Sequence, residues 1–265
     1  MSPVRIGRWS AVSLAVSSVL GVAAFCWPFF VAPGTVLADA ATEAPLIFGV
    51  LLVLVLGVLL AQLADGGIDA KALALLGVLA AVNAALRPLG AGAGGIETVF
   101  FLLVLAGRVF GPGFGFTLGS VSLFASALLT GGIGPWLPFQ MFGCAWVGLG
   151  AGLLPRASGR LEIVLLAAYG AVSAFGYGLA LNLSFWPFAI GAHTALSFDP
   201  NASTLTNLGR YLLFDTATSL GWDTGRAVTN VVAIVAFGPL VLATLRRASR
   251  RAAFDAPVEF HDKPV

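Results

Sequence analysis

The sequence predicts an all-α integral membrane protein with about eight transmembrane helices, and three observations support this fold class. Of the 265 residues, 58% are hydrophobic and only 10% are charged, whereas a soluble domain carries about 25% charged residues. The mean hydropathy is +0.97. The apolar residues also gather in runs close to the roughly 20 residues that a helix needs to cross a bilayer. These runs are 11–31, 46–64, 71–87, 97–110, 115–130, 139–154, 161–188 and 226–245.

The runs divide into two groups. The first two form an N-terminal extension over residues 1–66, and the other six form a core over residues 67–248. A polar tail over residues 249–265 is too short to fold alone, and we expect it to be disordered. Within the core, only a Gly-Pro-Gly turn joins the runs 97–110 and 115–130, so a tight hairpin is an alternative to two full crossings. The first run is longer than the apolar part of a signal peptide, and we expect it to be retained.

The positive charges predict the orientation, because Lys and Arg are retained on the cytoplasmic side of a bacterial membrane. With a cytoplasmic N-terminus, all but three of the 14 Lys and Arg residues lie on that side. The three exceptions are Arg87, Arg210 and Arg226. Both termini are then cytoplasmic, in the inner membrane. The loops at 88–95 and 131–138 and the long segment 190–224 emerge together on the outer face.

The most unusual of these segments is the turn at 131–141, which reads GGIGPWLPFQM. Its glycines and prolines leave backbone groups without helical hydrogen bonds, and hydrocarbon has no water to satisfy them. The turn therefore lines a wet cavity or lies at a membrane surface. We expect a binding site there.

Two aromatic–amide pairs are the candidate ligand-binding residues. Trp136 and Gln140 are four residues apart, as are Asn182 and Trp186, so each pair shares one side of a helix. A single Trp is typical of a membrane interface. An amide inside the membrane favours an interior or ligand-facing position, because it is costly in lipid. If both pairs converge, they would hold a ring system between indoles and orient it with amides.

Arg87 and Glu97 flank a glycine-rich stretch in the first outer loop and complete the candidate site at its rim. Opposite charges near a bilayer pair most simply with one another, and we expect an ion pair between them. Contact with the polar edge of a ligand is the alternative. The glycine-rich stretch itself lacks the Gly-Lys-Ser/Thr ending of a phosphate-binding loop.

Small residues recur at four-residue spacing, which lets helices approach closely in lipid. We expect most of them to pack inside the protein. The residues that we expect to pack inside the protein are Gly111, Gly115, Gly119, Gly148 and Gly152. The face formed by Gly77, Ala81 and Ala85 is the best candidate for docking on another membrane subunit. Cys26 and Cys144 lie in apolar runs without metal-type spacing, and we expect them to be packing residues.

Several functional classes are disfavoured by what the sequence lacks. It has no His-Glu-x-x-His motif, no Gly-x-Ser-x-Gly motif and no nucleotide-binding motif. The net charge of +2 is too small to indicate nucleic-acid binding. We therefore expect neither catalysis nor a cofactor in this chain. A lipid-modifying enzyme that uses Asp215, Asp223 and His193 is kept as an alternative.

Three strings carry a resemblance to a known family. They are AAVNAALRP at 80–88, LAGRVFGP at 105–112, and GPWLPFQM at 134–141 followed by WVGLG at 146–150. Across about 71–247 the chain resembles the substrate-binding S-components of energy-coupling factor (ECF) vitamin transporters in actinobacteria. The subgroup assigned to cobalamin is the most similar one. The two N-terminal runs are an addition to that family's six-helix core.

The resemblance implies a six-helix bundle that captures a vitamin-like molecule through its outer loops, here 88–96, 131–138 and 190–224. It also implies partners. Small residues on the first core helix, matched by Gly77, Ala81 and Ala85, would contact a transmembrane coupling subunit, and two cytoplasmic ATPase subunits or a fused pair would drive release. The segment 190–224 would act as a lid along the interface. Its apolar residues are Leu208, Tyr211, Leu212 and Leu220. The main rival is a membrane scaffold or assembly protein that uses its small-residue faces only to associate.

Overall fold

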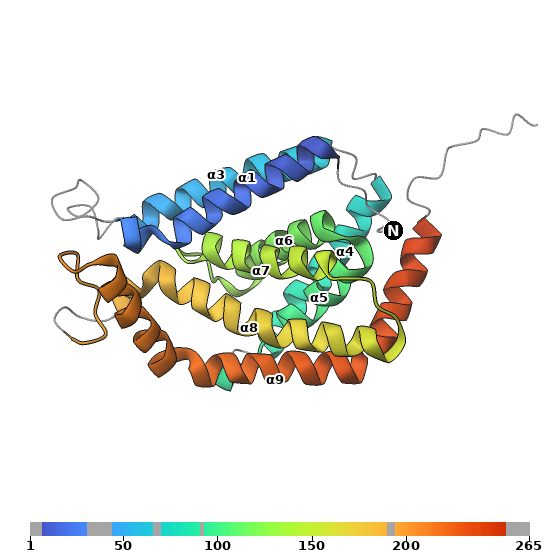
Figure 1. Cartoon of the computed structure of the whole chain (residues 1–265). Coiled ribbons are helices and arrows are strands. Elements are labelled where there is room, and N and C mark those ends of the chain that lie inside the picture. Colours follow the sequence, from blue (N-terminus) through green and yellow to red (C-terminus); the bar gives the residue numbers. More distant parts are fainter. Residues whose placement is uncertain (1–6, 31–43, 66–69, 91–92, 190–193, 253–265) are drawn as a thin grey trace, which may run out of the picture.

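The computed structural model of the protein describes residues 7–30, 44–65, 70–90, 93–189 and 194–252 (Figure 1). Every regular element in these ranges is a helix. In chain order they are α1 (Arg8–Phe25), η1 (Trp27–Phe30), α3 (Ala44–Asp65), α4 (Ala70–Gly90), η2 (Ala93–Gly95), α5 (Val99–Phe110), α6 (Pro112–Thr130), α7 (Leu137–Leu153), α8 (Gly159–Ala189) and α9 (Thr204–Ala252).

The helices confirm the all-α, membrane-spanning class at a coarse level. Six stretches of the described residues are long and apolar enough to cross a membrane. They are Arg8–Phe25, Ala70–Gly90, Ala93–Phe110, Pro112–Thr130, Gly159–Ala189 and Thr204–Arg250. Phe48–Ala61 and Leu137–Leu153 are apolar but shorter. The number of eight crossings and the orientation of the termini therefore stay predictions.

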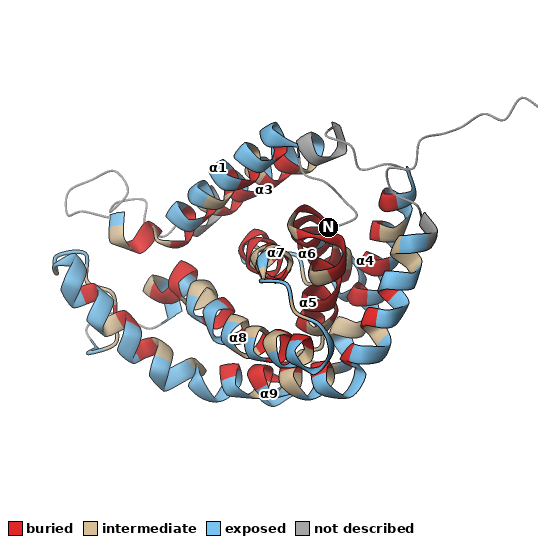
Figure 2. Ribbon diagram, turned by 45° about the vertical axis from the view of Figure 1, so that its right-hand side comes forward, coloured by how far each residue is buried: buried red, intermediate tan, exposed pale blue. Residues whose placement is uncertain are grey.

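The core of the bundle is formed by α5, α6 and α7. Figure 2 shows these three helices mostly buried at the centre, with the other long helices around them and exposed on their outward sides. The helices α1 and α3 lie together on one side (Figure 1). The pair α8 and α9 covers another side, and α4 packs against α6.

Glycines let α6 and α7 approach until their backbones touch. A Cβ atom built on Gly148 would overlap the backbone of Gly115, and one built on Gly119 would overlap the backbone of Cys144. Likewise, a Cβ on Gly152 would meet the backbone of Pro112. The expected internal packing of these small residues is confirmed. Gly111 has a different role, since it ends α5 with a φ of 102°, a conformation that glycine adopts without strain.

The helix α9 corrects the expected organisation of the segment 190–224. Residues from Thr204 onward form one continuous helix that includes Pro239 and runs to Ala252, so they are no separate amphipathic lid. The Ser203 hydroxyl accepts a hydrogen bond from the Thr206 N–H (3.1 Å) and caps the helix start. The helix has no proline between Thr204 and Pro239 that would break it. Of the four residues expected along the interface, Tyr211 is buried and Leu208, Leu212 and Leu220 are exposed. The expected disorder of the tail falls mainly on residues 253–265, which lie outside the described ranges.

An ion cluster closes the end of the bundle where α5 and α7 end and α8 begins. The Glu162 carboxylate accepts hydrogen bonds from Arg108 (2.8 Å) and Arg246 (2.6 Å), which ties α5, α8 and α9 together. Arg108 also donates to the backbone carbonyls of Leu154 and Pro155. The two arginines thus lie at the same end of the bundle, as the charge distribution predicted.

The glycine contacts give a first prediction. Replacing Gly148 by Ala places a methyl group against the Gly115 backbone and should lower the free energy of unfolding by about 1–3 kcal/mol, the usual cost of overpacking. The matched control is Gly77→Ala, because Gly77 is exposed and a Cβ there meets nothing within 4 Å. Thermal unfolding of the purified variants in detergent measures both changes. Equal midpoints for the two variants would contradict the glycine contact.

Candidate ligand-binding site

A cavity of about 780 Å³ opens at the other end of the bundle, where α4, α6 and α8 end and α7 begins. Its volume lies within the range of about 300–1,000 Å³ that is usual for small-molecule sites. Aromatic and aliphatic side chains form most of the wall. They include Val99, Leu123, Trp136, Phe139, Tyr177, Leu181 and Phe185. The charged and amide groups on the wall are Arg87, Glu97, Gln140 and Arg226.

The turn between α6 and α7 shapes one side of this cavity. Gly131 ends α6 in the left-handed conformation, with a φ of 67°, and the Leu137 N–H closes the turn on the Gly134 carbonyl (3.0 Å). Trp136 precedes α7 with 52% of its surface exposed, and Gln140 follows one helical turn later. Both line the cavity. The structure thus brings one of the two expected aromatic–amide pairs to a cavity wall.

Arg87 joins this pair from α4. Its guanidinium donates to the Gln140 Oε1 atom (3.2 Å) and to the Ser126 hydroxyl (3.4 Å). The expected ion pair between Arg87 and Glu97 is wrong, because Glu97 bonds Arg226 instead (2.9 Å).

Glycines in η2 explain where Glu97 points. Gly95 has a φ of 81°, and a Cβ there would overlap the Trp222 backbone on α9. A Cβ on Gly225 of α9 would in turn overlap the Gly94 backbone. This close contact holds the start of α5 against α9, and the Trp222 indole donates to Glu97 (3.3 Å).

Arg226 is the centre of a buried charge cluster that the sequence analysis missed. Its guanidinium contacts Glu97 and Asp223, and it lies over the rings of Phe100 (5.6 Å) and Tyr177 (5.1 Å). Two carboxylates and two aromatic faces therefore balance one buried cation. From the sequence we predict Asp223 and Arg226 in the outer segment, either paired with a neighbouring charge or solvated, but neither the burial of Arg226 nor its bond to Glu97.

A pattern in the sequence does indicate this burial. Arg226, Asn230 and Ile234 recur every four residues and are all buried. They face Gly170, Ala174 and Gly178, which are spaced in the same way on α8. The Asn230 amide donates to the Gly170 carbonyl (2.9 Å), Arg226 donates to the Ala174 carbonyl (3.2 Å), and a Cβ on Gly178 would overlap the Asp223 carboxylate.

The other expected pair does not line this cavity. Trp186 is fully buried, and its indole N–H donates to the Leu196 carbonyl (2.7 Å). It packs against Tyr211 and Phe198. The Asn182 amide donates to Asp215 (2.7 Å). The i, i+4 spacing does place both residues on one face of α8, but that face contacts the first part of α9 instead of a ligand cavity.

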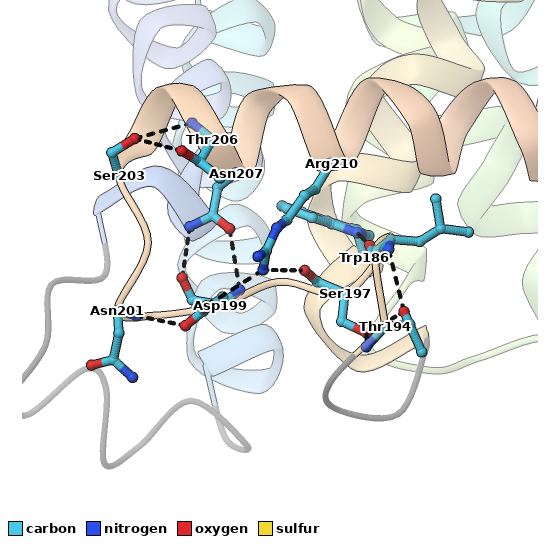
Figure 3. Close-up of polar contacts among 10 residues, drawn as sticks. Trp186, Thr194, Ser197, Asp199, Asn201, Ser203, Thr206, Asn207 and Arg210 are labelled. Carbon is cyan, nitrogen blue, oxygen red and sulfur yellow. Dashed lines mark hydrogen bonds and ion pairs between the residues drawn. The ribbon is translucent and has the colours of Figure 1, made fainter.

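The loop before α9 is held by its own polar network, which Figure 3 shows beside Trp186. The Asn207 side chain donates to the Asp199 carbonyl (2.8 Å) and accepts from the Asp199 N–H (3.1 Å). Arg210 donates to the Ser197 carbonyl (3.2 Å) and lies 3.5 Å from the Asp199 carboxylate. These bonds fix the described part of the loop, from residue 194, onto α9.

The N-terminal helices support the cavity wall from behind. Phe25 packs edge-on against Phe139, a cavity residue, with ring centroids 5.0 Å apart. The buried Trp27 indole donates to the carbonyl of Ser184 (2.8 Å), another cavity residue. A Cβ on Gly49 of α3 would lie 3.3 Å from the Pro135 carbonyl. The extension therefore holds the turn, α7 and α8 in place around the cavity.

Two residues of the alternative enzyme, Asp215 and Asp223, are described, and they bond different partners. Asp223 pairs with Arg226, while Asp215 accepts a hydrogen bond from Asn182. His193 lies outside these ranges. Within them, no group of three His, Cys, Asp or Glu side chains is arranged to hold a metal ion.

Removing the buried cation should be costly. Arg226→Ala leaves Glu97 and Asp223 without their partner and should lower the free energy of unfolding by about 3–5 kcal/mol. Arg210→Ala is the control, because Arg210 and Asp199 form a more exposed pair worth about 0–1 kcal/mol. Denaturant or thermal unfolding in detergent compares the two variants. A loss for Arg226→Ala no larger than that of the control would rule out the charge cluster.

Weakening the N-terminal support should loosen the cavity wall. Trp27→Ala removes a buried indole that stacks on Phe48 and Phe188, and we expect a loss of about 3–5 kcal/mol. Phe30→Ala, on the same short helix but exposed, should change stability by less than about 0.5 kcal/mol. Unfolding midpoints test the pair. If Trp27→Ala is as stable as Phe30→Ala, the extension does not support the wall.

The chain matches no protein-family model, no curated protein and no solved structure. The resemblance to ECF S-components stays a prediction.

Proposed function

We propose that the protein is the substrate-specific membrane subunit of an ECF-type importer, which captures a vitamin or related micronutrient at the outer face of the bacterial cell membrane. Cobalamin is the first candidate, on the subgroup resemblance of the sequence. The observation that carries the proposal is the cavity of about 780 Å³ at the bundle end formed by the turn at 131–136.

The lining of the cavity supports capture of a small organic molecule. Such sites are mostly apolar, with a few polar groups that orient the ligand. Here Trp136 and Phe185 offer exposed aromatic surface, while Arg87 and Gln140 offer hydrogen-bond donors. In the orientation predicted from the positive charges, this end of the bundle faces outward, as a capture site requires.

An exposed face on α4 supports a membrane partner. Gly77, Ala81 and Ala85 are all exposed in this single chain, and a Cβ on Gly77 would meet nothing within 4 Å. Small residues on a free helix face let a second helix approach closely in lipid. In the proposed importer, a transmembrane coupling subunit covers this face and ATPase subunits in the cytoplasm supply the energy.

Purification and uptake test the proposal together. Protein purified from its native host should carry a vitamin-like molecule and the ATPase subunits, both identified by mass spectrometry. Trp136→Ala should weaken ligand binding and uptake at low vitamin concentration by about tenfold, or roughly 1.4 kcal/mol, because the ligand loses its aromatic contact. Trp9→Ala is the control, since Trp9 is exposed and distant from the cavity residues in the sequence.

The alternative function, a membrane scaffold or assembly protein, predicts a different result. In that case no small molecule co-purifies, and Trp136→Ala leaves growth on a scarce vitamin unchanged.

A further inference from the structure

The two arginines that line the cavity have different kinds of partner. Arg226 is matched by the carboxylates of Glu97 and Asp223. Arg87 contacts only a neutral amide and a hydroxyl, on Gln140 and Ser126. No carboxylate of the described residues lies within the 4.0 Å of an ion pair with Arg87.

The two contacts of Arg87 leave much of its bonding capacity unused. A guanidinium has five N–H donors in a planar fork. The bonds to Gln140 and Ser126 are 3.2 and 3.4 Å long, longer than the usual 2.9–3.0 Å or so of an N–H···O bond. Gln140 uses its oxygen to accept from Arg87, which leaves its NH₂ group as a further donor beside the guanidinium.

The charges at the cavity are unevenly distributed, because both carboxylates bond Arg226 and neither bonds Arg87. Arg87, Arg226 and Glu97 line the cavity, and Asp223 does not. Glu97 is bonded to Arg226 and forms no ion pair with Arg87. A charge among apolar side chains is costly unless it is paired. Arg87 therefore keeps a positive charge on the cavity wall that no carboxylate of the described residues pairs.

We propose that the ligand carries an anionic group, a carboxylate or a phosphate, which binds Arg87 and the Gln140 amide, and an apolar ring that packs on Trp136 and Phe185. This rests on the proposed function of the site. Arginine suits the role because its fork donates two parallel hydrogen bonds to a carboxylate or phosphate. Gln140 and Ser126 hold the Arg87 guanidinium in place, and because both are neutral they leave its positive charge uncompensated.

Fluorescence quenching tests the anion site without knowledge of the ligand. Iodide and caesium ions quench exposed Trp136, and the difference between the wild type and Trp136→Phe isolates its signal. Iodide should quench this signal at least about twofold more strongly than caesium, because the Arg87 guanidinium has no carboxylate partner among the described residues and attracts anions to the wall that it shares with Trp136. Arg87→Gln should abolish the preference, while Arg87→Lys should keep it. Arg210→Gln is the control and should leave it unchanged. Equal quenching in the wild type, or a preference that survives in Arg87→Gln, would overturn the proposal.

Matched pairs of vitamins test the ligand class. Biotin and biotinamide, nicotinate and nicotinamide, and pantothenate and panthenol compare a carboxylate with a neutral form, while pyridoxal phosphate and pyridoxal compare a phosphate with none. Binding is followed by thermal shift. For any pair that binds, the anionic member should bind at least about tenfold more tightly, and Arg87→Gln should remove the difference.

The outcomes separate the two proposals. If a pair binds and the neutral member binds as tightly, the anion proposal is overturned while the capture function stands. If iodide is preferred, yet no pair binds and no molecule co-purifies, the anion site stands and the capture function fails.

Discussion

Direct backbone contact between α6 and α7 is the constraint on which the rest of the structure depends. In lipid, apolar side chains gain little by facing one another, because the acyl chains are equally apolar. Helices that are to stay together need close van der Waals contact along their length. Gly115 and Gly148 provide it, since each has the other's backbone where a Cβ would be. Gly107 adds α5 to the contact, because a Cβ on it would overlap the Gly148 backbone.

The position of these glycines also determines where the cavity is. On α6 they precede residue 120, and on α7 they follow residue 142. Both groups lie toward the end of the bundle that carries the Arg108–Glu162 pair. At the opposite end, larger side chains such as Leu123 and Phe139 replace glycine, and the cavity opens among them. One helix pair thus supplies both a tightly packed base and an open site.

The sequence was sufficient for the features that depend on local composition. Apolar runs predicted the long helices, and the aromatic turn led to Trp136 and Gln140 on the cavity wall. Features that depend on which helices pack against each other could not be predicted from the sequence. Glu97 bonds Arg226, which lies 129 residues away in the chain. This ion pair depends on the contact of η2 with α9. Asn182 and Trp186 have the same spacing as Trp136 and Gln140, and only tertiary packing directs them toward α9 instead of the cavity.

The N-terminal extension has a consequence for biosynthesis. Trp27 lies 157 residues ahead of Ser184, the residue whose carbonyl it binds. Chains emerge from the ribosome from the N-terminus onward, so the first hairpin enters the bilayer well before its partners on α7 and α8. The pocket is therefore completed late in synthesis, because Tyr177 and Leu181 of α8 and Arg226 of α9 form part of its wall.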